Sequence, residues 1–390
     1  MQSQAENLPT TIPINQGAFS VLRSLRLSTF QIGSAMGEIL TASVWNRVMI
    51  SDLGMPATPV GLLLALQYIL LPIGLWIGHR SDTVRLLGRR RDSYIWLGRG
   101  LMLLAFPLLG QSVAYFESAE TTLGWLLATV AFLLFGSGKL ASGSVFLALV
   151  RESAPAEKQG LAIGLTETAL ITLFPIVAIS FGRWMEHYEE ALFWQLIVAT
   201  IVIGGFFWWL AIFRVEDRVA EIETSRSNTL AFRQTLSQIW SNAPTRAFFI
   251  FLSTATFAAW MQDNILEPFG GDVFSLPAGI TTRFTGYWGG TTVLFALACF
   301  GLLRERLPQD QGRLTSSGLI VMAISMVLLA VTSFTNSSTL LTPSLLLFGA
   351  GFGVYTFGGL SLMAVMSPSK HAGAYLGLWT ASILLSKGAG

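Results

Sequence analysis

The chain is dominated by long apolar stretches, and their length limits what it can fold into. Ten of them have roughly 20 residues, the length that a helix needs to cross about 30 Å of hydrocarbon. Their approximate limits are 27–50, 58–78, 93–116, 122–150, 160–182, 191–213, 246–266, 284–303, 314–334 and 342–366, and an eleventh begins near Ala372 and runs to Gly390. None alternates as a strand would, and backbone groups in lipid must be paired within the fold. We therefore predict an all-α integral membrane protein.

Composition and motifs exclude several other classes. The chain is 52% hydrophobic and 12% charged, whereas a soluble domain is about a quarter charged. No cleavable signal peptide precedes Arg23, and the single cysteine, Cys299, excludes a disulfide framework. The sequence has no phosphate-binding Walker loop, nucleophile elbow or metal-spaced set of His and Cys. An enzyme and a metal centre are therefore not expected.

One loop pattern occurs twice and indicates two similar halves. Pro-x4-Gly-x3-Gly-Leu begins at Pro155 and again at Pro368, each time between two apolar stretches. Such internal repeats are typical of two-lobed transporter folds. We expect 12 transmembrane helices in the full protein and about 11 here, because the chain stops within the eleventh. The predicted parts are a cytoplasmic N-terminal segment (1–26), an N-terminal six-helix lobe (27–213), a cytoplasmic inter-lobe linker (214–245) and a C-terminal lobe truncated in helix 11 (246–390).

The distribution of charge predicts the orientation. With a cytoplasmic N-terminus, nearly all loop Arg and Lys residues fall on the inner side, as the positive-inside rule requires. The outer loops then carry Asp52, Glu117, Glu120, Glu186, Glu189, Glu190, Asp263, Glu267 and Asp272. Because the basic residues are scattered over several short loops, nucleic-acid binding is not expected.

Unpaired charges inside apolar stretches are costly, and four charged residues are singled out here by their depth. Glu38 and Lys139 each lie about 11 residues from the cytoplasmic end of their stretch, which is a depth of about 16 Å. We therefore predict an ion pair between them. Arg99 and Glu167 share a shallower depth of about 9–11 Å. Arg99 is predicted either to pair with Glu167 or to extend to the cytoplasmic headgroups.

The loop after the second stretch has the pattern Gly-x3-Asp-x5-Gly-Arg-Arg. It resembles a cytoplasmic loop of the major facilitator superfamily, with three residues more than usual between Asp and Gly. A carboxylate among arginines at this place can latch neighbouring helix ends, and glycine permits the tight turn. The expected latch residues are Gly78, Asp82, Arg85, Gly88, Arg90 and Arg91.

A narrower resemblance is to the PucC/LhaA group. It is carried by Leu27-x2-Phe30-Gln31, by Asn46-Arg47-Val-Met-Ile and by the latch loop with Tyr94-Ile-Trp that follows. The resemblance implies a major-facilitator-like factor of a phototroph that assists assembly of light-harvesting complexes and handles chlorophyll or bacteriochlorophyll. It also implies a photosynthetic membrane (thylakoid or intracytoplasmic) or a bacterial inner membrane.

Light-harvesting or photosystem subunits and chlorophyll-biosynthesis proteins are then the expected partners, besides the lipid bilayer. Arg47 and its neighbour Asn46 are expected at the outer rim of the central cavity, where Arg47 either anchors the rim or contacts a lipid phosphate.

A bound pigment would need an axial ligand for magnesium. The histidines, His79, His187 and His371, lie near span ends or in loops, so none is expected at mid-membrane. Magnesium accepts oxygen readily. The candidate oxygen donors are Gln31, Glu38, Asn46 and Gln67, with a water or a peripheral histidine as alternatives.

The buried acids also suit a different function. A proton-coupled carrier of a small solute, working by alternating access through Glu38 or Glu167, is the alternative that the residues leave open.

Overall fold

The computed structural model describes residues 20–71, 77, 81, 84–86, 88–89, 91–154, 159–215, 240–303, 308–335, 337–366 and 382–388. The predicted N-terminal segment is thus described only from Ser20, the inter-lobe linker only at its ends and the first copy of the loop repeat only from Gln159, and the second copy, 368–378, lies outside the described residues. The described residues are almost entirely helical, and within them the sole β feature is an isolated bridge between Leu86 and Arg89. The all-α prediction is confirmed.

The first half of the chain forms one group of helices, the N-lobe. Its elements are α1 (Val21–Ser28), α2 (Phe30–Glu38), the π-helices η1 (Ile39–Trp45) and η2 (Val48–Asp52), α3 (Ala57–Ile69), α5 (Asp92–Glu117), α6 (Thr121–Glu152), α7 (Gln159–Trp184), α8 (Glu190–Ala199), the π-helix η4 (Thr200–Gly204) and α9 (Gly205–Ile212). The first helix starts at Val21, earlier than predicted, because the Ser20 hydroxyl caps it by accepting a hydrogen bond from the Arg23 amide at 3.2 Å.

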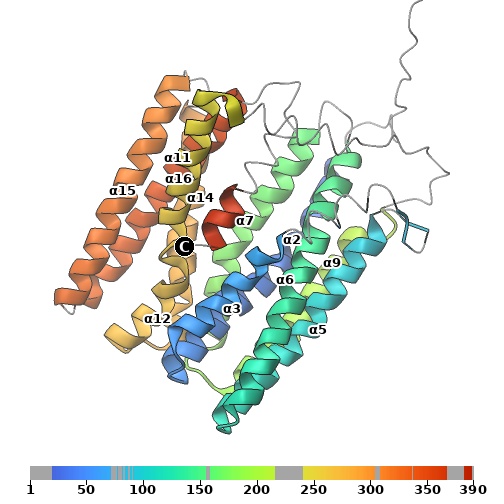
Figure 1. The fold of residues 1–390 in the computed structure, drawn as a ribbon, viewed down its shortest axis with the longest axis vertical. Helices are drawn as coiled ribbons and strands as arrows, with labels where there is room; N and C mark the ends of the chain where they lie inside the picture. The colour runs from blue at the N-terminus through green and yellow to red at the C-terminus, as the bar shows by residue number, and fades with distance from the viewer. Residues whose placement is uncertain are drawn as a thin grey trace, which may run out of the picture.

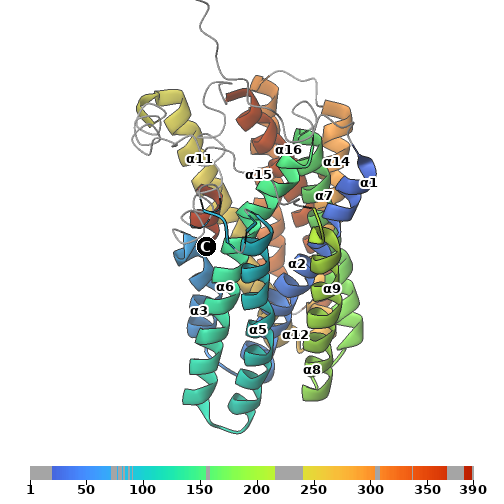
Figure 2. The same cartoon turned by 90° about the vertical axis from the view of Figure 1, so that its right-hand side faces the viewer.

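The second half forms the C-lobe. Its elements are α11 (Ala243–Trp260), α12 (Asp263–Phe274), α13 (Ala278–Thr281), α14 (Arg283–Leu303), α15 (Pro308–Thr335), the 3-10 helix η5 (Ser338–Leu340) and α16 (Leu341–Met366). A further helical run covers residues 382–388. Figure 1 shows the two groups of helices, with α7 and the last described run between them, and Figure 2 shows the molecule from the side of the N-lobe, with α5 and α6 in front.

Length and composition qualify six of the described helices to cross a membrane. They are Asp92–Glu117, Thr121–Val150, Leu165–Trp184, Glu190–Ile212, Gly312–Thr335 and Ser338–Gly359. Two further predicted spans are helical but interrupted. The first is divided at Thr29 and changes to π-helix at Ile39, and the seventh is divided at Met261–Gln262 between α11 and α12.

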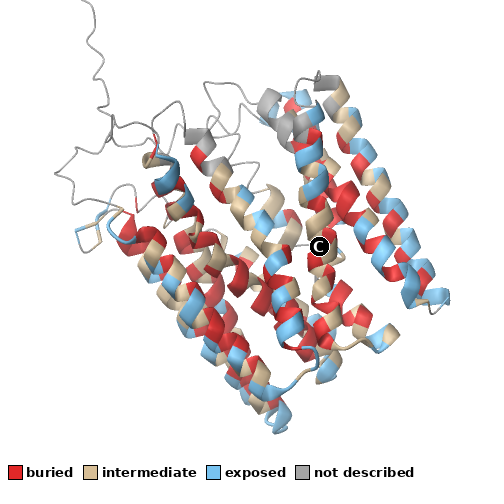
Figure 3. Cartoon of the chain, turned by 180° about the vertical axis from the view of Figure 1, so that it is seen from behind, coloured by how far each residue is buried: buried red, intermediate tan, exposed pale blue. Residues whose placement is uncertain are grey.

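Each lobe has its own hydrophobic core. The N-lobe core is built around large buried side chains such as Phe30, Trp45 and Trp208, and the C-lobe core around Trp288 and Phe348. Figure 3 shows exposed residues of the bundle in pale blue, and many of them are large apolar side chains such as Leu104, Phe206 and Val327. A large apolar exterior is what lipid solvates, whereas water would not.

The lobes meet at the end of the bundle that the charge distribution predicts to face outward. The Gly279 amide donates to the Glu186 carbonyl at 2.9 Å, and Arg283 Nη2 donates to the Gly182 carbonyl at 3.3 Å. A side chain on Gly279 would lie 2.3 Å from the carbonyl oxygen of Gly182, so glycine is required for this close approach. We call the contacts of Arg47, Ser51, Gly182 and Glu186 with residues 268–283 the outer seam.

Candidate functional site

The centre of the molecule holds the ion pair predicted from depth. Lys139 Nζ on α6 lies 2.8 Å from Glu38 Oε1 and 2.7 Å from Oε2, at the end of α2. The same ammonium donates to Gln67 Oε1 on α3 at 2.9 Å, and Gln67 Nε2 donates to the Leu64 carbonyl at 3.2 Å. Three helices of the N-lobe are thereby tied together. The Lys139 side chain is 36% exposed and that of Glu38 is 15% exposed, so the pair borders an opening rather than a closed core.

The C-lobe presents a second acid and lysine pair to the same place. Lys387 Nζ lies 3.6 Å from Asp263 Oδ2, at the start of α12. It also stands over the ring of Trp260, 3.6 Å from the ring centroid, which is a cation–π contact. Trp260 packs edge-on against Trp288 and Phe352. The second pair therefore rests on an aromatic wall.

The two pairs belong to one cluster. The charge of Lys387 acts on the Glu38 carboxylate and on the Tyr68 hydroxyl, which are both in the N-lobe. The Cα of Gly388 is so close to α3 that an added side chain would lie 2.5 Å from Tyr68 Cβ. We call Glu38, Gln67, Lys139, Asp263 and Lys387 the central cluster. It contains two ammonium groups and two carboxylates drawn from both lobes.

Irregular helix accompanies both acids. Glu38 directly precedes π-helix η1, and Asp263 directly follows the break at Met261–Gln262. Interrupted helices and π-bulges expose backbone groups, and in membrane proteins they concentrate at binding sites. The same location in both lobes favours a ligand site between them.

Arg47 lies at the outer seam, where its guanidinium binds groups of the protein. It is 4% exposed, and its Nη1 lies 3.0 Å from Asp52 Oδ2. Across the lobe boundary, Nε donates to Thr281 Oγ1 at 3.2 Å and Nη2 to the Leu276 carbonyl at 3.0 Å. Arg47 therefore fastens the outer seam. The neighbouring Asn46 is buried, with 1% exposure.

Neither prediction for Arg99 is correct. Its guanidinium carbon lies 4.2 Å from the centroid of Phe30 and 4.7 Å from that of Trp208, and Nη1 contacts Met102 Sδ at 3.2 Å. The residue is 4% exposed, so it does not extend to the headgroups. Within the described residues no ion pair links it to Glu167. Two aromatic faces take the place of a carboxylate, and equal depth does not put two residues on facing sides of their helices.

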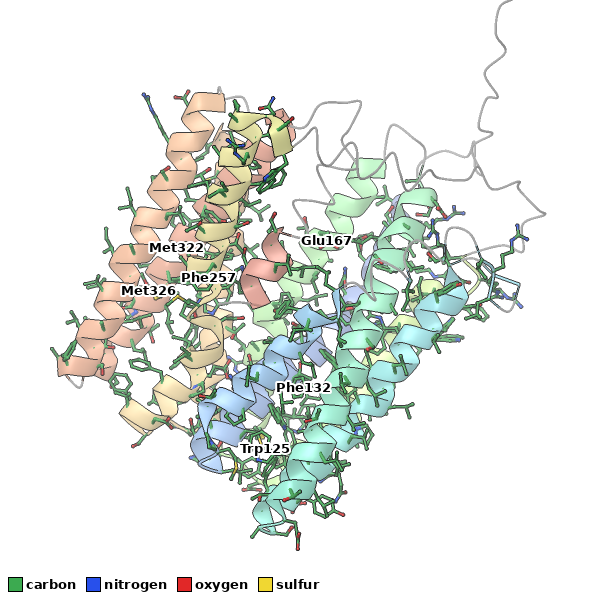
Figure 4. All side chains as sticks on the ribbon, viewed as in Figure 1. Trp125, Phe132, Glu167, Phe257, Met322 and Met326 are labelled. Carbon is green, nitrogen blue, oxygen red and sulfur yellow. The ribbon has the colours of Figure 1, made fainter. Side chains whose placement is uncertain are left out.

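Glu167 lies on α7, between the two groups of helices (Figure 4). Its Oε1 is 3.5 Å from Gln31 Nε2, which donates to it from α2. It therefore lies apart from Arg99 and beside one of the predicted pigment ligands.

The latch loop is described in part, and Gly78, Asp82 and Arg90 lie outside the described residues. Gly88 has φ +76°, which glycine adopts without strain, and Arg85 precedes the turn, which Leu86 and Arg89 close with two backbone hydrogen bonds. Arg91 joins helix ends: its Nη2 is 2.7 Å from Glu152 Oε1 at the end of α6, and its Nη1 donates to Ser81 Oγ at 2.8 Å. In the described part of the loop the carboxylate partner of Arg91 is Glu152, which the motif had not indicated.

The four oxygen donors proposed for magnesium do not form a ready ligand site. Both Glu38 oxygens and the Gln67 oxygen accept from Lys139. Gln31 and Asn46 are buried, with 5% and 1% exposure. A macrocycle needs an unengaged donor facing open space, which these side chains do not offer in this conformation.

Two acids were misplaced by the sequence interpretation. Asp263 and Glu267 were assigned to an outer loop, but both lie on α12, and Glu267 is 2% exposed. The predicted stretch 246–266 crosses the break at Met261–Gln262, but Glu267, Pro268 and Asp272 hide the continuation of α12 to Phe274. Lys387 was also missed, because it stands near the end of the chain. Its position within an apolar stretch was the available signal.

Two lobes of membrane-crossing helices with a charged cluster between them define a major-facilitator-like integral membrane protein. A solved structure described as a bacterial homologue of the human lysosomal transporter Spinster, inward-facing and unoccupied, has a TM-score of 0.69 and covers 94% of this chain and 80% of its own, at 14% identity. The D-xylose-proton symporter has a TM-score of 0.68, with 95% and 88% covered, at 15% identity.

The chain belongs to the PUCC protein family, whose model matches residues 44–390. Protein PucC of Rhodovulum sulfidophilum is 31% identical, with 98% of this chain and 87% of that protein covered. Protein PucC of Cereibacter sphaeroides is also 31% identical, with 96% and 83% covered. The bacteriochlorophyll synthase 44.5 kDa chain of Rhodobacter capsulatus is 29% identical, with 95% and 85% covered.

Proposed function

We propose that this protein is a membrane assembly factor of a phototroph that handles chlorophyll or bacteriochlorophyll during biogenesis of light-harvesting or photosystem complexes. The observation that carries the proposal is relatedness over nearly the whole chain to proteins named PucC and to one named as a bacteriochlorophyll synthase chain. Family and fold favour a non-enzymatic role, so we place the chain among handling factors rather than synthases.

The central cluster supports a binding role for the space between the lobes. Charged side chains inside a membrane bundle are costly and mark ligand paths, and here they adjoin an aromatic wall of Trp260, Trp288 and Phe352. A ligand with a flat apolar body and a polar edge fits such surroundings. We assign no magnesium ligand, because the candidate oxygens are engaged or enclosed.

The proposal extends to location and partners. We place the chain in a photosynthetic (thylakoid or intracytoplasmic) or bacterial inner membrane with a cytoplasmic N-terminus, in contact with light-harvesting or photosystem subunits or with chlorophyll-biosynthesis proteins. The sidedness of Arg and Lys supports the orientation.

The test is gentle purification of the full-length protein from its native membrane, followed by an absorption spectrum and identification of co-purifying proteins. We expect chlorophyll-type absorption and photosynthetic subunits. Trp260→Ala should lower the pigment content, whereas Trp209→Ala, which is 44% exposed on the flank of α9, should leave it unchanged. A colourless protein without photosynthetic partners would refute the proposal.

A second function is favoured by a specific observation. The two acid and lysine pairs at the lobe boundary are arranged as in a carrier that binds a small polar solute and a proton. The carrier hypothesis requires that a solute raises the melting temperature of the purified protein and that Glu38→Gln abolishes the effect. If such a solute stabilises the protein and leaves its pigment content unchanged, solute binding and pigment binding are separate functions.

A further inference from the structure

One buried carboxylate at the lobe boundary has no cationic partner. Glu38 pairs with Lys139, Asp263 with Lys387 and Asp52 with Arg47. Glu267, one turn after Asp263 on α12, is 2% exposed and forms no ion pair among the described residues. An isolated carboxylate in such a place is costly by several kcal/mol or more, so it must be neutralised.

Hydroxyl groups surround this carboxyl from both lobes. Thr285 on α14 donates to Glu267 Oε1 at 3.1 Å, and its oxygen lies 3.4 Å from Ser43 Oγ on η1. The hydroxyls of Ser43 and Thr282 lie close enough to act on the carboxyl. Four oxygen-bearing side chains thus converge from α12, from the junction of α13 and α14, from α14 and from the π-helix of the first span.

Two atoms of this group remain unsatisfied. Glu267 Oε2 and Thr282 Oγ1 are buried and form no hydrogen bond of normal distance and angle, although the Thr282 hydroxyl lies close to the carboxyl, and Thr282 is 1% exposed. Buried polar atoms are nearly always paired in native proteins. One added positive charge would satisfy both: a proton on Oε2 can be donated to a hydroxyl oxygen, and a sodium ion would be coordinated by the carboxylate and hydroxyl oxygens.

The surrounding charges do not supply that neutralisation. Asp263 is also negatively charged and so repels a negative charge on Glu267. The ion-pair partner of Asp263 is Lys387. Arg47 approaches from the first span, but its guanidinium is bound to Asp52, Thr281 and the Leu276 carbonyl.

We propose that Glu267, Ser43, Thr282 and Thr285 form a site for one exchangeable positive charge, either a proton or a sodium ion. Ser43 belongs to the N-lobe and the other three residues to the C-lobe. The bound charge therefore stabilises the lobes in contact at this level, and its loss weakens the outer seam.

The experiment measures the melting temperature of the purified full-length protein in two series. In one, sodium replaces choline at constant ionic strength and pH; in the other, pH is lowered without sodium. Wild type should gain several degrees in one series, because a ligand that binds only the folded state stabilises it. A gain with sodium identifies the sodium ion. A gain as the pH falls identifies the proton, because the folded protein then binds more protons than the unfolded one.

The variant Glu267→Gln should show neither gain, since the amide is neutral and nearly the same size. Glu120→Gln, an exposed carboxylate at the start of α6, is the matched control and should respond as wild type does. If Glu267→Gln does not fold, Thr285→Val should still reduce the gain by removing one hydroxyl. A wild type that responds in neither series, or a gain of equal size in Glu267→Gln, would overturn the proposal.

Discussion

At the scale of single residues, each charged side chain inside the bundle needs a partner that compensates for the loss of water, and the partners differ in kind. Lys139 is satisfied by a carboxylate and an amide, and Arg99 by two aromatic faces. Glu267 is surrounded only by hydroxyls. The kind of partner therefore determines how much stability is lost when one of the two interacting side chains is replaced.

We expect Lys139→Met to destabilise the protein, because it leaves the Glu38 carboxylate without its cation. Removing one partner of a fully buried pair costs about 3–5 kcal/mol. Since the Lys139 side chain is 36% exposed, solvent screens part of the charge, and we expect a loss of about 2 kcal/mol. The double variant Glu38→Gln/Lys139→Met should recover most of it. Thermal unfolding measures both, and equal stability of the single variant and wild type would contradict the prediction.

The depth of a residue in the membrane could be predicted from the sequence, but the side of the helix on which it lies, and so the neighbour it contacts, could not. The Glu38–Lys139 contact followed from counting residues along two spans of the same lobe. The same counting failed for Arg99, because its actual neighbours, Phe30 and Trp208, are indistinguishable in sequence from lipid-facing aromatics. Asp263 was assigned to the outer loop because it lies near the end of its predicted stretch, and the sequence does not show that the helix continues to Phe274.

At the scale of elements, the outer seam depends on how closely backbones approach. α13 packs on the end of α7 with glycine on both sides, at Gly279 and Gly182. In lipid, helix association relies on close packing and interhelical hydrogen bonds, so small residues at such a crossing determine whether the contact forms.

Gly279→Ala should weaken this crossing. Its new methyl group would lie 2.3 Å from the Glu186 Cα and from the Gly182 carbonyl oxygen, and overpacking of this kind costs about 1–3 kcal/mol. Gly290→Ala on α14 is the control, because a methyl group there meets no atom within 4 Å and should be neutral or stabilising by about 0.5–1 kcal/mol. The melting temperatures of the two variants, each compared with that of the wild type, test this prediction. Equal changes in both variants would contradict it.

At the scale of the whole molecule, most of the hydrogen bonds that the described residues form between the lobes lie at the outer seam or beside Glu267, and Lys387 adds one to Tyr68 at the central cluster. The central cluster lies inward from them, with Lys139 partly exposed. This distribution corresponds to a conformation closed at the end that the charge distribution predicts to face outward. This protein of the PUCC family thus has a boundary between two lobes that can close at one end, which is the element from which alternating access is made in folds of this kind.

If Arg47 closes the outer side, Arg47→Gln should open it. Ala278, which is 1% exposed under the seam, can report this as Ala278→Cys in a Cys299→Ser background, treated with a membrane-impermeant maleimide. We expect little labelling with Arg47 intact and an increase of about tenfold after Arg47→Gln. Three charge-assisted contacts are lost, and each 1.4 kcal/mol shifts the closed and open populations tenfold.

Glu120→Cys, exposed at the outer end, should label equally in both backgrounds. Unchanged protection of Ala278→Cys would show that the glycine contacts alone hold the seam closed.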